Sequence, residues 1–156
     1  MKKIIIIILF FCTSLYAEKI ERLGFYNLQE LLEDDNLTYK IIKNCVSLNS
    51  AITEITKKDH PDLSKSFFET ANYLYPFGIL TLSKIKKMNY EDVEKEYMSS
   101  VEAKTSDYID FMKQNGVANQ SFIKGTFIGD DLNFCNEIRS AIEITISESK
   151  ELKLKK

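Results

Sequence analysis

The sequence is poor in the residues that build turns and metal sites. Its 156 residues include five glycines, two prolines and one histidine. Because an all-β protein needs many tight turns, this scarcity of Gly and Pro argues against one. Zinc sites take about four Cys, His or carboxylate ligands, and a single imidazole does not supply such a set. We therefore expect an all-α fold that holds no metal and no cofactor.

The chain also lacks an excess of charge of one sign. It has 21 Lys and Arg against 23 Asp and Glu, and the lysines are interleaved with acids along most of the sequence. Proteins that bind nucleic acid usually present a basic face. We therefore expect no nucleic-acid partner.

Motifs of common enzyme classes are missing as well. The segment Gly125–Gly129 matches neither the G-x-x-x-x-G-K-[ST] nor the G-x-G-x-x-G phosphate-binding pattern. His60, flanked by Asp59 and Asp62, is the one imidazole available as a general base, but no evident nucleophile accompanies it. We expect a protein that is not an enzyme. The alternative is a hydrolytic enzyme that uses scattered carboxylates and His60.

The first 17 residues have the pattern of a secretory signal peptide. A basic start at Lys2 and Lys3 precedes a run of uncharged residues, and Ala17 comes just before the charged Glu18. The apolar part of this run is shorter than the roughly 20 residues that span a membrane. We predict cleavage after Ala17, export to the periplasm and no stable membrane span afterwards. The alternatives are an extracellular protein or one anchored by an uncleaved signal.

The rest of the chain has the size of one compact domain. Removing the first 17 of the 156 residues leaves 139, which is close to the commonest domain length. Neither a repeat nor a low-complexity linker divides it. We predict a single helical-bundle domain over residues 18–149. Residues 150–156 are predicted to be a basic, frayed C-terminal tail, because chain ends are usually poorly ordered.

Apolar residues recur at helical spacing through most of this domain, which predicts a small bundle of four to five antiparallel helices. Asn27, followed by Glu30 three residues later, predicts the start of a short first helix. A second helix is predicted over residues 38–58, and Pro61 is suited to the first turn of a third. The third helix should kink or break at Pro76, because proline lacks the N–H and crowds the carbonyl four residues earlier.

Two more helices are predicted in the second half of the chain. Asn89 is a typical N-cap for the fourth helix. Gly116 is expected to end it as a left-handed cap. After a loop, Asp130 or Asp131 should cap the last helix.

Two cysteines remain after signal cleavage, Cys45 and Cys135, and each lies on the apolar stripe of its predicted helix. In an oxidising compartment such a pair normally forms a disulfide. Closing a loop of about 90 residues stabilises a fold by about 4 kcal/mol. A catalytic pair is not expected, because redox cysteines usually sit two residues apart. We predict a structural disulfide that staples the last helix onto the bundle, and buried free thiols are the alternative.

The densest group of aromatic residues surrounds the proline of the third helix. Tyr73, Tyr75, Pro76, Phe77 and Gly78 form the candidate binding surface, because an interrupted helix leaves carbonyls and rings available to a partner. Packing in the core is the competing use of these rings. We expect a small exported binding protein, immunity-like or chaperone-like, whose partner is another protein or a small apolar ligand.

Overall fold

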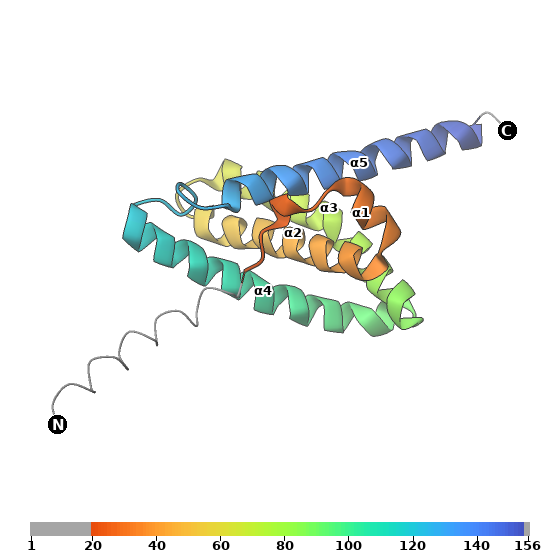
Figure 1. The fold of residues 1–156 in the computed structure, drawn as a ribbon, viewed down its shortest axis with the longest axis horizontal. Coiled ribbons are helices and arrows are strands. Elements are labelled where there is room, and N and C mark those ends of the chain that lie inside the picture. Colours follow the sequence, from red (N-terminus) through yellow and green to blue (C-terminus); the bar gives the residue numbers. More distant parts are fainter. Residues whose placement is uncertain (1–19, 155–156) are drawn as a thin grey trace, which may run out of the picture.

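The computed structural model describes residues 20–154, which form a bundle of helices without a strand. A 3-10 turn, η2 (Leu23–Phe25), is followed by α1 (Leu28–Glu33), α2 (Asp35–Thr56), α3 (Pro61–Lys86), α4 (Tyr90–Asn119) and α5 (Ile128–Leu154). The long helices run alternately in opposite directions, and α2 contacts α1, α3, α4 and α5 (Figure 1). The all-α bundle predicted from the apolar spacing is confirmed.

The predicted signal peptide, residues 1–17, lies outside the described residues. At the other end, α5 continues to Leu154, into the segment predicted to be a frayed tail. No helix in residues 20–154 is both long enough and apolar enough to cross a membrane.

Three helix starts predicted from the sequence are confirmed. The side chains of Asn27 at α1 and Asn89 at α4 each accept a backbone N–H from the residue three positions later, at 3.0 and 2.8 Å. Pro61 is the first residue of α3. Between α1 and α2, Asp34 accepts two N–H groups of the following turn, and α2 therefore begins three residues earlier than predicted.

The chain stays helical through Pro76, so of the kink or break predicted there, a break is excluded. A proline inside a helix costs about 3 kcal/mol. The neighbouring residues Leu74, Gly78 and Ile79 are buried. Tertiary packing on both sides of the proline thus offsets the lost hydrogen bond. Leu63, at the start of the same helix, is 48 % exposed although its spacing places it on the apolar stripe.

The predicted end of α4 at Gly116 is also wrong. The helix continues to Asn119, and Gln120 takes the left-handed conformation at its end with φ of 54°. Gly116 serves close packing instead, because an added Cβ would lie 2.8 Å from Cε1 of Phe122. The glycine admits a ring from the following loop rather than ending the helix.

The start of α5 is tied to residues 20–26, which we call the N-terminal strap. The helix begins at Ile128, so Asp131 lies in its first turn and is not the N-cap predicted for it. Its carboxylate instead accepts the backbone N–H groups of Leu23 at 2.8 Å and Gly24 at 3.0 Å. Because Leu23 is fully buried, this contact anchors the strap on α5.

The predicted disulfide Cys45–Cys135 is confirmed. It joins the middle of α2 to the first half of α5, with Cα atoms 5.4 Å apart and both cysteines fully buried. Buried apolar residues of α2, from Ile41 to Ile52, continue the core along the helix on both sides of the bridge.

Candidate functional site

The residues of the predicted binding surface lie on one helix but meet two different neighbours. Tyr73 and Phe77 are one turn apart, with ring centroids separated by 5.8 Å. The Tyr73 ring is covered by the guanidinium of Arg139 from α5, 5.3 Å from its centroid. Tyr75 and Gly78 instead contact α4. The predicted set is therefore divided between the α5 and α4 sides of α3.

Tyr75 and Gly78 form the close approach between α3 and α4. The Tyr75 ring meets the ring of Tyr97 edge-on, at 5.1 Å between centroids. A Cβ added to Gly78 would lie 2.0 Å from the Tyr97 hydroxyl oxygen, so no other residue fits without displacing that ring. Burial raises the pKa of both tyrosines. Tyr75 and Gly78 therefore serve to pack α3 against α4.

Phe77 lines an apolar groove enclosed by four helices. The groove has a volume of about 370 Å³ and lies between α1, α2, α3 and α5; Figure 1 shows α1 beside the part of α5 that leaves the bundle. Leu31, Ile42 and Ile138 are its most deeply buried residues. Eight of the ten lining residues are apolar, and the set is Leu28, Leu31, Thr38, Ile42, Phe77, Ile138, Ala141, Ile142, Thr145 and Ile146.

The disulfide holds two walls of this groove together. Cys45 follows Ile42 by three residues on α2, and Cys135 precedes Ile138 by three residues on α5. Because three to four residues make one helical turn, the bridge lies about one turn from the groove on both helices. The spacing of the two walls is therefore fixed covalently.

The hydroxyl groups that line the groove already have backbone partners. Thr38 donates to the carbonyl of Leu31, and Thr145 donates to the carbonyl of Ala141 at 2.9 Å. All the described lining residues are uncharged. Such a site favours apolar groups, because it offers neither an acid or base nor a nucleophile for chemistry.

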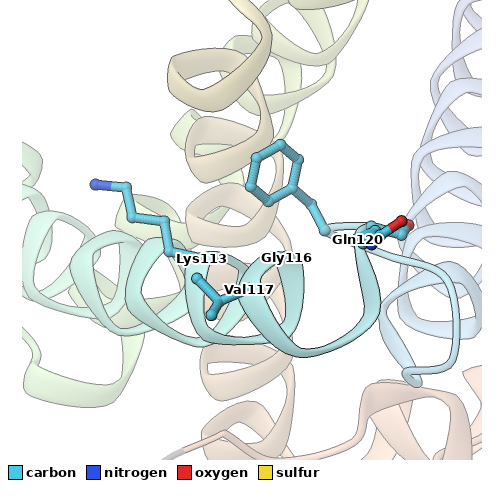
Figure 2. A pocket seen from close by; sticks show the side chains of 6 residues that line it. Lys113, Gly116, Val117 and Gln120 are labelled. Atoms are coloured by element: carbon cyan, nitrogen blue, oxygen red, sulfur yellow. The ribbon is translucent and has the colours of Figure 1, made fainter.

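A second hollow, with a volume of about 570 Å³, lies at the C-terminal end of α4 (Figure 2). It is larger than the groove, but its lining comes from one stretch of ten residues. Val117 in this stretch is 88 % exposed. A single helix end and the loop after it enclose a ligand less completely than four helices do. The lining residues are Lys113, Gly116, Val117, Gln120, Ser121 and Phe122.

His60, on which the hydrolase alternative depends, is exposed at the turn between α2 and α3. It is the N-cap residue of α3, and its side chain makes no capping hydrogen bond. Asp59 and Asp62 beside it are exposed too. Within residues 20–154, no three His, Cys, Asp or Glu side chains gather as a metal site would require. The histidine has the ordinary surroundings of a helix start.

Asp131 has the most unusual surroundings of the described carboxylates, because its residue is fully buried. Burial raises its pKa to about 6, although the N–H groups of Gly24 and Leu23 act in the opposite direction. Oδ1 accepts both of these N–H groups, while Oδ2 has no hydrogen-bond partner within the described part of the chain. The sequence hides this role, since an aspartate near a helix start looks like an ordinary cap.

No protein-family model, no curated protein and no solved structure matched the chain. The groove and the charges around it are the features that indicate a function.

The apolar spacing of the sequence marks residues of the groove but does not reveal the groove itself. Leu31, Ile138 and Ile142 recur at helical spacing with other apolar residues, and such spacing does not distinguish a groove from a closed core. The available signal was a mismatch of lengths, because α1 has six residues and α5 has 27. A long apolar stripe opposite a short helix leaves part of that stripe uncovered.

Proposed function

We propose that the protein is a non-enzymatic binding protein, exported to the periplasm, that holds the apolar face of an amphipathic helix from a partner protein. The groove between α1 and α5 is the proposed site. One observation carries the proposal: the groove is an apolar site of about 370 Å³, within the range of about 300–1,000 Å³ typical of ligand pockets. Masking an apolar helix of another protein is a task suited to an immunity-like or chaperone-like role.

Export is supported by two features of different kinds. The start of the sequence has the basic and apolar order of a secretory signal. The Cys45–Cys135 disulfide belongs to the chemistry of oxidising compartments, since cytosolic thiols are normally kept reduced.

The shape of the groove favours a helix over a small ligand. Ile142 and Ile146 continue the apolar lining along α5, and both are only partly buried. An amphipathic helix anchors such a surface with apolar side chains three and four residues apart. A small ligand usually needs a few free polar groups to orient it, and both hydroxyls of the lining are engaged with the backbone.

The charges beside the groove indicate a cationic partner. Exposed glutamates on the two flanking helices include Glu30 and Glu33 on α1 and Glu148 on α5. The guanidinium of Arg139 on α5 is paired with Glu143 at 2.9 Å. Complementary charges at the rim of an interface guide association and orientation. We therefore expect basic residues on the flank of the bound helix.

A synthetic helix provides the test. The probe is a 15-residue amphipathic peptide made only of leucine and lysine, and its affinity is measured by fluorescence anisotropy. We expect Ile142→Glu, which places a charge in the groove, to weaken binding at least about 30-fold, or about 2 kcal/mol. Ile144→Glu is the matched control, because Ile144 is 57 % exposed and lies outside the groove lining.

Two of the following outcomes would overturn the proposal, and equal affinity for an acidic peptide would contradict the expected charge of the partner. Equal losses in the two variants would mean that the groove is not the site. Equal affinity for a leucine and glutamate peptide would remove the charge argument. Binding of an apolar dye in the groove without binding of the peptide would assign the site to a small ligand.

A further inference from the structure

The N-terminal strap is fastened to α5 through one buried carboxylate. Asp131 Oδ1 accepts the N–H groups of Leu23 and Gly24, at 2.8 and 3.0 Å. Both Leu23 and Asp131 are completely excluded from solvent. A buried charge is costly unless hydrogen bonds satisfy it, and Oδ2 has no such partner among the described residues. In the contact that holds the strap against α5, Oδ2 of Asp131 is therefore buried without a hydrogen bond from the described residues.

Few charged or titratable groups act on this carboxylate. From the strap, Arg22 favours its negative charge, whereas Asp130 of α5 disfavours it. From α4, the buried hydroxyl of Tyr108 feels the charge of Asp131 and, more weakly, that of Glu21. Burial outweighs the favourable contacts.

We propose that Asp131 is a proton-controlled latch, which holds the N-terminal strap more firmly when the surroundings become mildly acidic. Protonation at Oδ2 removes the buried charge, and Oδ1 still accepts both N–H groups of the strap. The proposal is independent of what the groove binds.

The direction of the pH dependence follows from the pKa of Asp131 in the closed and open states of the strap. With the strap closed, burial raises the pKa of Asp131 to about 6. Opening exposes the carboxylate to water and returns its pKa toward the ordinary value of 3.8. The closed state thus binds the proton more tightly, and its advantage is lost as the pH rises through about 6. Between about pH 7.5 and about pH 5, the fraction of open strap should fall about tenfold.

A carboxylate within the strap, Glu21, sets the lower limit of the pH range in which acidification holds the strap more firmly. Glu21 accepts hydrogen bonds from Lys40, at 2.7 Å, and from the hydroxyl of Tyr26. Burial raises the pKa of Glu21, but these two partners bring it below its usual value. A lowered pKa favours closure above the ordinary value and is lost as the pH falls further. Acidification should therefore hold the strap more firmly down to the ordinary Glu21 pKa of 4.5, below which the Glu21 contribution is lost.

Amide hydrogen exchange followed by NMR tests the latch, because the amides of Leu23 and Gly24 are themselves the donors. After correction for intrinsic exchange rates, their protection should rise about tenfold from about pH 7.5 to about pH 5. Asp131→Asn should remove this dependence on pH. Asp130→Asn is the matched control at the exposed neighbouring position and should retain it.

Protection that stays constant, or that falls on acidification to pH 5, would overturn the proposal. So would an unchanged pH dependence in Asp131→Asn. Should that variant fail to fold, a carboxyl carbon NMR titration of the wild-type protein decides the question. A pKa of Asp131 near 6 supports the latch, and an ordinary value near 4 contradicts it.

Discussion

The two halves of α5 have the same helical structure but opposite surroundings. In the first half, Ile128, Asp131, Cys135 and Ile138 are buried, and the half is fastened by the disulfide and the strap. In the second half, Ile142 and Ile146 are partly buried and Ile144 is 57 % exposed. Figure 1 shows the C-terminal end of α5 extending beyond the other helices. One helix therefore has a buried half that is fastened to the bundle and a more exposed half that lines the proposed binding site.

Arg139 lies at the boundary between the two halves of α5 and joins the helix to α3. Its guanidinium donates to the Thr70 hydroxyl of α3 at 2.9 Å and covers the Tyr73 ring. After this point Ile142 still packs against the core, and the exposed turns beyond Ile146 extend a helix already formed, which is easier than starting a helix anew. A preformed, partly exposed helix binds a partner at a lower entropic cost than a disordered segment.

Removing the disulfide should have the largest effect on the stability that the first half of α5 gives to the fold. Replacing Cys45 and Cys135 together with alanine should lower the free energy of unfolding by about 4 kcal/mol, because the bridge closes a loop of about 90 residues. Urea unfolding of the oxidised wild type and of the double variant measures the difference. A loss below about 1 kcal/mol would show that the first half of α5 does not depend on its staple.

Truncating one isoleucine in each half compares the halves directly. Ile138→Ala should cost about 2–5 kcal/mol, since Ile138 is 4 % exposed. Ile144→Ala should change the free energy of unfolding by no more than about 0.5 kcal/mol. Both values come from the same urea titration. Similar costs at the two positions would mean that the second half is packed after all.

Shortening the chain should have the smallest effect. A variant that ends after Ile146 lacks the last part of α5, in which residues 147–151 are exposed. Its free energy of unfolding should differ from that of the wild type by less than about 0.5 kcal/mol. A larger loss in thermal or urea unfolding would reveal a stabilising contact of these residues.

The sequence carries the information that depends on spacing. Helical periodicity gave the bundle, and the positions of Cys45 and Cys135 on two apolar stripes predicted their disulfide. Spacing does not report which backbone groups approach one another from distant parts of the chain. Gly116 and Asp131 were therefore assigned as local caps, whereas one admits the Phe122 ring and the other binds the strap.

The candidate site was only partly predictable for a similar reason. Phe77 was proposed from its aromatic neighbourhood and does line the groove. Tyr75 was proposed from the same neighbourhood, yet it packs on Tyr97 of α4. Spacing gives the face of α3 on which each ring lies, but which helix packs against that face depends on the assembled bundle. The groove itself arises because α1 is too short to cover α5, and this is a property of the assembled bundle.

Hydrogen exchange along α5, with and without the leucine and lysine peptide, tests whether the two halves of the helix differ in stability and in binding. For the protein alone, we expect slow exchange of the amides from Asp131 to Ile138 and much faster exchange from Ile142 onward. Addition of the peptide should slow exchange around Ile142 and Ile146 and leave the first half unchanged. Uniform protection along the whole helix in the free protein, or no change on addition of the peptide, would contradict the division of α5 into a structural half and a binding half.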